Sequence, residues 1–158
     1  MLSIVLPAKN EADGLKKVLP IIHALYPRAE LIVIDDGSTD DTTEVAKSFG
    51  ARVVRHVRSL GNGAAIKSGA RAARGDIIVF MDADGQHKPE DIALLLSELN
   101  CGYDMVVGAR SMASQAGAHR AVANAFYNSF ATWMVGQTVS DLTSGFRAVK
   151  SVLFRKYL

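Results

Sequence analysis

Short segments typical of buried strands alternate along the chain with segments of helical periodicity, and this alternation restricts the fold more than any other feature. The expected strands are Ser3–Leu6, Leu31–Ile34, Ala51–Arg55, Ile77–Met81 and Met105–Gly108. Alternating strands and helices form right-handed crossovers, which place the strands parallel in one sheet with helices on both faces. We therefore expect an α/β fold with a Rossmann-like, mainly parallel sheet.

The intervening segments carry recognisable helix signals. Apolar residues recur at helical spacing across Leu15–Leu25, although Pro20 is expected to kink or restart that helix. Capping residues open a second helix within Thr39–Phe49, and an alanine-rich helix is expected over Gly63–Arg74. Pro89 suits the first turn of a fourth helix.

Composition limits the class of protein. The 158 residues, of which 49% are apolar and 22% charged, fit one globular domain over 1–158. A net charge of +2 gives no case for nucleic-acid binding, and a single cysteine excludes an internal disulfide. No signal peptide or membrane-spanning stretch is recognisable. We expect a cytoplasmic protein, at the cytosolic face of a membrane.

Two carboxylates follow the fourth expected strand. Asp82 and Asp84 lie two residues apart, and in an extended segment such residues point the same way. They can therefore reach one hard cation, with the amide oxygen of Gln86 as a third ligand. Oxygen ligands suit Mg²⁺ or Mn²⁺, which keep few protein carboxylates and accept substrate phosphates at their other positions. The segment indicates a metal that holds a diphosphate.

Other polar groups follow other strand ends. Asp35 and Asp36 follow the second expected strand, and Arg110 follows the fifth. Ligands of parallel sheets bind at this edge, and paired acids repel each other unless a cation or sugar hydroxyls satisfy them. Alone, Asp35-Asp36-Gly37-Ser38 is explained more simply as a turn. Gly61-Asn62-Gly63 is better interpreted as a helix start than as a phosphate-binding loop.

An aromatic stripe recurs at helical spacing within 120–136. The simpler interpretation is a helix packed on the sheet. The alternative is a helix that dips into a membrane surface, with Trp133 and Tyr127 at the level of the lipid headgroups.

Several motifs together resemble a known family. They are Pro7-Ala8-Lys9-Asn10-Glu11, Asp35-Asp36-Gly37-Ser38, Gly75-Asp76, Asp82-Ala83-Asp84-Gly85-Gln86-His87, Gly108-Ala109-Arg110 and Ser140-Asp141-Leu142-Thr143-Ser144-Gly145-Phe146-Arg147. In this order they resemble a family 2 glycosyltransferase of the GT-A fold. The likeness is greatest to polyprenyl-phosphate sugar transferases such as dolichyl-phosphate mannosyltransferase.

The resemblance implies roles on the donor side, within residues 1–110. Pro7, Lys9 and Glu11 would line the nucleotide pocket, and Asp35 with Asp36 would contact the base or ribose.

It also implies that Asp82 and Asp84 act in catalysis, handling the donor sugar and the divalent cation together with Gln86. Residues 111–158 would form the acceptor side. The resemblance assigns the acceptor phosphate and its surroundings to Arg110, the last residue of the donor part, and to Arg120, Asn124 and Arg147, with Arg110 also counted as catalytic.

The implied reaction is metal-dependent transfer of a sugar, with inversion, onto a polyprenyl or dolichyl phosphate. The expected donor is GDP-mannose, or a UDP-sugar that supplies a hexose. Relatives continue beyond the last motif, so we expect a domain truncated at its C-terminus that binds donor but transfers poorly. Two alternatives stay open: a family 2 transferase that acts on a saccharide hydroxyl, and a non-enzymatic, Mg²⁺-binding domain like a response regulator.

Overall fold

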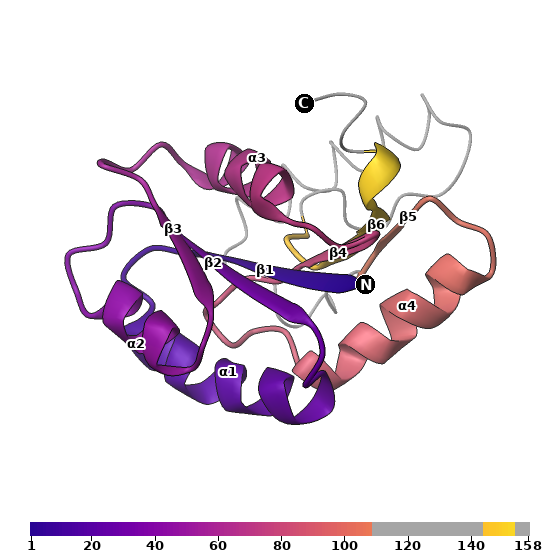
Figure 1. The fold of residues 1–158 in the computed structure, drawn as a ribbon, viewed down its shortest axis with the longest axis horizontal. Helices are drawn as coiled ribbons and strands as arrows, with labels where there is room; N and C mark the ends of the chain where they lie inside the picture. Colours follow the sequence, from indigo (N-terminus) through magenta and orange to yellow (C-terminus); the bar gives the residue numbers. More distant parts are fainter. Residues whose placement is uncertain (109–143, 154–158) are drawn as a thin grey trace, which may run out of the picture.

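The computed structural model describes residues 1–108 and 144–153, which form a sheet of six strands with helices on both sides (Figure 1). The strands are β1 (Leu2–Ala8), β2 (Glu30–Asp35), β3 (Arg52–Arg55), β4 (Ile77–Phe80), β5 (Met105–Val107) and β6 (Arg147–Lys150). The helices are α1 (Ala12–Leu25), α2 (Thr42–Ser48), α3 (Asn62–Ala72) and α4 (Ile92–Asn100), and the 3-10 turn η1 (Pro89–Asp91) precedes α4.

The sheet has the strand order β3-β2-β1-β4-β6-β5. Strands β1 to β4 are parallel to their neighbours, whereas β6 runs antiparallel to both β4 and β5. The predicted α/β class with a mainly parallel sheet is confirmed. The five predicted strands and the helices between them are all present, with bounds that differ by a few residues.

Strand β6 was not predicted. It consists of Arg-Ala-Val-Lys, so only Ala148 and Val149 carry a local apolar signal. Its place is fixed by pairing on both edges, with β4 on one side and β5 on the other. Such pairing joins segments distant in the sequence, which a local pattern cannot show.

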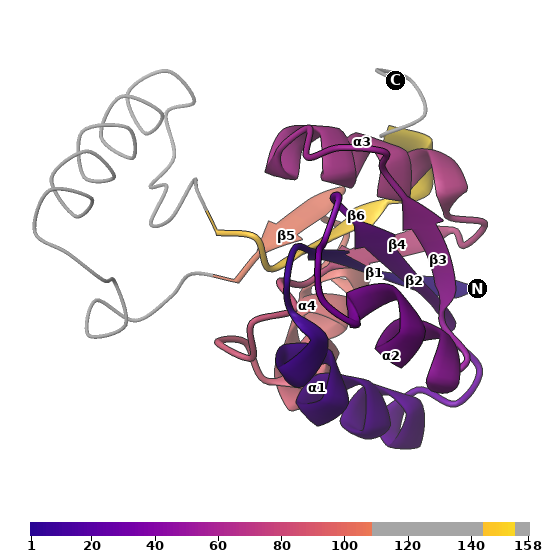
Figure 2. The ribbon, with the colours of Figure 1, turned by 90° about the vertical axis from the view of Figure 1, so that its left-hand side faces the viewer.

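Helix α3 covers one face of the sheet and α1, α2 and α4 cover the other (Figure 2), and an apolar core lies on each face. Side chains of β1 alternate between them: Ile4 and Leu6 pack with α1, α2 and α4, whereas Val5 packs with α3. Residues of one strand point alternately to its two faces, so a strand covered on both sides is apolar throughout. This explains the continuous apolar runs in the sequence.

Helix α1 continues through Pro20 as one element, so the expected restart does not occur. Pro20 has no backbone N–H to donate to the carbonyl of Lys16, four residues earlier. Both residues lie on the exposed side of the helix, while Leu15 and Ile22 are buried. Water can satisfy the freed carbonyl there. None of the helices within 1–108 and 144–153 is both long enough and apolar enough to cross a bilayer.

The register of the sheet determines where functional side chains gather. Ala8 pairs with Asp35, and Val5 pairs with Phe80, so β1, β2 and β4 end at the same edge. Ligands of open α/β sheets bind at the carboxyl ends of the strands. Any site built from the predicted motifs must therefore lie at this edge.

Candidate active site

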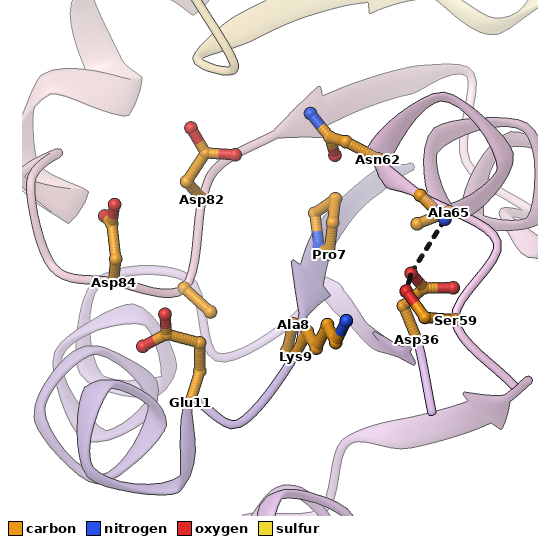
Figure 3. Close-up of a pocket in the computed structure, with 12 residues that line it drawn as sticks. Pro7, Ala8, Lys9, Glu11, Asp36, Ser59, Asn62, Ala65, Asp82 and Asp84 are labelled. Carbon is orange, nitrogen blue, oxygen red and sulfur yellow. Dashed lines mark hydrogen bonds between the residues drawn. The ribbon is translucent and has the colours of Figure 1, made fainter. Parts of the chain in front are cut away.

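A cavity of about 400 Å³ opens at the carboxyl edge of the sheet, beside the first turn of α3 (Figure 3). It is lined by Pro7, Ala8, Lys9, Glu11, Asp36, Ser59, Gly61, Asn62, Ala65, Asp82, Ala83 and Asp84. Its volume is in the range of small-molecule sites. The structure thus brings together most of the donor-side residues predicted from the sequence.

Asp36 stands at one side of this cavity and is almost fully buried. Its carboxylate accepts hydrogen bonds from His56 Nδ1 at 2.6 Å and Ser59 Oγ at 2.7 Å. The backbone N–H groups of Leu60 and Gly61 add two more, at 2.8 and 2.9 Å. Burial by itself would raise the pKa of Asp36, but these hydrogen bonds outweigh it and hold the pKa well below its ordinary value.

Asp35 is also buried but does not line the cavity. It accepts hydrogen bonds from the backbone N–H of Ser38, at 2.7 Å, and from the hydroxyl of Thr43 on α2. Arg55 Nε lies 3.6 Å from Asp35 Oδ2, the oxygen that accepts the Thr43 hydrogen bond. Burial opposes ionisation, yet the Ser38 and Thr43 hydrogen bonds lower the pKa of Asp35. Asp35 therefore ties the end of β2 to α2, and only Asp36 of the predicted pair borders the cavity.

Asp82, Asp84 and Glu11 lie together on the opposite side of the cavity (Figure 3). The Asp82 side chain is 34% exposed, and Asp84 is exposed. Burial raises the pKa of Glu11, and the negative charges of Asp84, Asp40 and Asp82 raise it further. This side of the cavity thus concentrates negative charge that a cation would neutralise.

The donor set fits a metal that arrives with a substrate. Within residues 1–108 and 144–153, no three acidic, histidine or cysteine side chains converge as a metal cage. Mg²⁺ and its relatives need only one or two protein carboxylates when phosphates and waters complete the coordination. Gln86, the predicted third ligand, is exposed and does not line the cavity, but its backbone N–H donates to Asp84 Oδ1 at 2.9 Å.

A segment distant in the sequence supports the acidic loop. A Cβ atom at Gly145 would lie 2.2 Å from Asp82 Oδ2, so only glycine allows this approach. The ring of His87 stacks on Phe146 with 4.9 Å between centroids, and His87 Nε2 lies 3.8 Å from Asp82 Oδ2. His87 was interpreted as a loop residue rather than a ligand; it is a buried support beside Asp82.

The predicted acceptor-side residues are less fully described. Arg147 opens β6 opposite Phe80, and its guanidinium donates to the carbonyl of Ser144 at 2.6 Å rather than lining the cavity. Three predicted residues and one segment lie outside the described residues: Arg110, Arg120, Asn124 and the aromatic segment 120–136.

Sequence reasoning did not assign several residues of the site. Gly61 and Asn62 were interpreted as a helix start, and α3 does begin at Asn62, but both also line the cavity. Ser59 and His56 carried no motif. The available signal was the glycine-rich segment that follows a strand and opens a helix, a pattern that favours contact with phosphates.

Comparison with known proteins identifies the family. The model of glycosyl transferase family 2 matches residues 3–158. The polyprenol monophosphomannose synthase of Mycolicibacterium smegmatis is 28% identical over 166 residues, which cover 97% of this chain and 63% of that protein. The undecaprenyl-phosphate 4-deoxy-4-formamido-L-arabinose transferase of Edwardsiella ictaluri is 31% identical, covering 99% and 51%. The chain therefore spans between about half and two thirds of the length of these relatives.

Solved structures agree with this assignment. Glucosyl-3-phosphoglycerate synthase from Mycobacterium tuberculosis, in complex with Mn²⁺ and UDP-glucose, is 31% identical with a TM-score of 0.78, covering 97% of this chain and 57% of that one. Mannosyl-3-phosphoglycerate synthase from Rubrobacter xylanophilus is 27% identical with a TM-score of 0.79, covering 97% and 54%.

The sheet itself argues against the response-regulator alternative. Proteins of that kind have the strand order 2-1-3-4-5, whereas this sheet has the order β3-β2-β1-β4-β6-β5, with the antiparallel β6 between β4 and the edge strand β5. The family match and the TM-scores of 0.78 and 0.79 to glycosyltransferase structures confirm the predicted resemblance. The chain belongs to glycosyl transferase family 2 and has the GT-A fold.

Proposed function

We propose that this protein transfers a sugar from a nucleotide diphosphate to a polyprenyl phosphate, with inversion and with the help of Mg²⁺ or Mn²⁺. One observation carries the proposal: the paired carboxylates Asp82 and Asp84 face a cavity whose opposite side is built around Asp36. The curated relatives that act on polyprenyl or undecaprenyl phosphates support the acceptor class.

The donor would lie across the cavity. Pro7, Lys9 and Asp36 would surround the nucleotide, and the exposed ammonium of Lys9 would attract the diphosphate. Asp82 and Asp84 would hold the cation. When bound, the cation would stabilise the negative charge that develops on the leaving diphosphate. The Mn²⁺ and UDP-glucose bound by a structural neighbour support this arrangement.

The acceptor side is proposed from chemistry. A phosphate monoester is largely ionised near neutral pH, since its second pKa is about 6, and it needs little help from a general base. We assign acceptor binding to Arg110, Arg120, Asn124 and Arg147. Of these, the structure describes Arg147, at the end of β6 that pairs with the last residue of β4.

A second candidate acceptor is a small phosphorylated acid. The observation in its favour is the similarity to synthases whose structures contain phosphoglyceric acid. Polyprenyl phosphate and phosphoglycerate both carry a phosphate monoester, so one arginine-rich acceptor side could receive either. The donor half of the site would be the same in both cases.

A transfer assay tests the proposal and separates the two acceptors. Radiolabelled GDP-mannose and UDP-glucose are incubated with the chain and Mn²⁺, with a short polyprenyl phosphate in one arm and 3-phosphoglycerate in the other. Calorimetry measures donor binding in the same samples. We expect donor binding and weak labelling of the lipid. Labelling of phosphoglycerate alone would favour the second acceptor, and absence of donor binding would overturn the proposal.

A further inference from the structure

His56 links the cavity to the interior of the protein. It follows β3, is 9% exposed, and its backbone N–H donates to the Asp35 carbonyl at 2.8 Å. Its Nδ1 lies 2.6 Å from Asp36 Oδ1, and its Nε2 lies 2.9 Å from the hydroxyl of Ser68 on α3. The imidazole therefore bridges a carboxylate at the cavity and a helix behind it.

The partners determine the direction of these hydrogen bonds. The Asp36 carboxylate can only accept, so the proton of the imidazole is carried on Nδ1. In the neutral ring, Nε2 is then the acceptor, and the Ser68 hydroxyl donates to it. Donation to an ionised oxygen makes the Asp36 hydrogen bond the stronger of the two.

Asp36 has no acceptor capacity to spare. An ionised carboxylate offers about four lone-pair sites, and its four donors are His56, Ser59, Leu60 and Gly61. Three of these donors belong to the loop 59–61, which presents Ser59 and Gly61 to the cavity. Asp36 thus acts through the loop that it organises, and His56 is the donor that comes from outside that loop.

We propose that His56 is a positioning residue for the donor nucleotide, which holds Asp36 so that loop 59–61 keeps the shape that contacts the nucleotide. This inference rests on the proposed function, because it assigns the cavity to the donor. It adds a residue that contacts no ligand itself and lies behind the carboxylate at the cavity.

The order Ser68, His56, Asp36 is also that of a hydrolase triad. A nucleophilic serine must face a substrate site. Ser68 lies on α3 and does not line the cavity at the carboxyl edge. The positioning role therefore explains the arrangement better than nucleophilic catalysis does.

Two substitutions of His56 separate its two hydrogen bonds. In His56→Asn, the side-chain N–H₂ can occupy the position of Nδ1 and donate to Asp36. In His56→Gln, the longer side chain reaches toward Ser68 and leaves Asp36 without this donor. His23 is exposed on α1, away from the cavity, so His23→Gln is the matched control.

The experiment is calorimetric titration of each variant of the full chain with UDP and GDP in the presence of Mn²⁺, with the melting temperature measured in parallel. We expect His56→Gln to weaken nucleotide binding about tenfold, whereas His56→Asn stays close to the unsubstituted chain. His23→Gln should leave binding unchanged. Ser68→Ala is a milder second variant, which should weaken binding about threefold because it removes a neutral hydrogen bond.

The outcomes that would overturn the inference are distinct. Equal nucleotide affinity in both His56 variants, whether unchanged or equally reduced, would show that the Asp36 hydrogen bond does not position the nucleotide. If His56→Gln does not fold, undiminished binding by Ser68→Ala would decide against the inference. If the unsubstituted chain binds neither UDP nor GDP, the proposed function fails and the inference fails with it.

Discussion

The two acidic pairs at the carboxyl edge, one after β2 and one after β4, look alike in the sequence but have opposite surroundings. Asp35 and Asp36 are buried, and their oxygens accept hydrogen bonds from the protein itself. Asp82 and Asp84 face an open cavity beside a third carboxylate. The first pair stabilises the fold, and the second presents negative charge to the cavity.

Spacing explains much of this difference. Asp35 and Asp36 are adjacent, so they point to opposite sides of the extended chain. Asp35 reaches α2, whereas Asp36 reaches the loop before α3. Asp82 and Asp84 are separated by one residue, and both face the cavity. Asp35 and Asp36 thus stabilise two different elements, whereas the turn after β4 brings Asp82 and Asp84 to the same cavity.

The largest expected effect is that of Asp36→Asn on stability. The new N–H₂ group would replace one of the two oxygens and so face the backbone donor of either Leu60 or Gly61, and we expect a loss of about 3 kcal/mol in the free energy of unfolding. Asp84→Asn, at an exposed position, should change it by less than about 0.5 kcal/mol. Urea unfolding measures both variants, and equal losses would remove the contrast between the two pairs.

Gly145→Ala should displace the side chain of Asp82, a member of the second acidic pair. Its Cβ would collide with the carboxylate of Asp82, and we expect about tenfold weaker Mn²⁺-dependent binding of UDP. Gly63→Ala is the matched control, because a Cβ there meets nothing within 4 Å. Calorimetry compares the two variants. Unchanged binding in Gly145→Ala would show that the position of Asp82 is unimportant.

Low pH should destabilise the protein by protonating Asp35 and Asp36. The pKa values of Asp35 and Asp36 are lowered in the folded state, whereas an unfolded aspartate has a pKa of about 3.9. Their contribution is therefore present above that value and is lost as the pH falls toward the folded pKa values. Urea unfolding between about pH 5 and pH 3 should show that the free energy of unfolding falls less steeply with pH in Asp36→Asn than in the unsubstituted chain. An equal slope would contradict this assignment.

A smaller effect is expected at Glu11. Burial, and then the charges of neighbouring acids, raise its pKa in the folded state. The free energy of unfolding should therefore fall as the pH rises and Glu11 ionises at its folded pKa. Bound Mg²⁺ should lower that pKa by neutralising Asp82 and Asp84. Carboxyl NMR titration with and without Mg²⁺ measures the change, which should be absent in Asp84→Asn. A similar change in that variant would place the cation elsewhere.

Local patterns predicted much of the fold and part of the site. Apolar runs predicted β1 to β5. Asp82 and Asp84 both line the cavity, although β4 ends at Phe80 and residues 83–84 form a turn instead of the extended segment that the prediction assumed. Strand β6 was not predictable in this way, because its pairing with β4 joins residues about 70 positions apart in the sequence.

The different environments of the acids depended on remote partners. Thr43 and His56, which satisfy Asp35 and Asp36, come from α2 and from the end of β3. Gly145, which makes room for Asp82, comes from the other end of the chain. Residue types and spacing located the acids, but only the folded structure shows that Asp35 and Asp36 are buried among donors from distant segments.

The most direct test of this account is the effect of Mn²⁺ on nucleotide binding. UDP and GDP are titrated into the unsubstituted chain and into Asp84→Asn, with and without Mn²⁺. We predict that Mn²⁺ strengthens nucleotide binding by the unsubstituted chain, and that Asp84→Asn keeps its melting temperature but loses this dependence. Metal-dependent binding that persists in Asp84→Asn would contradict the assignment of the cation to the second acidic pair.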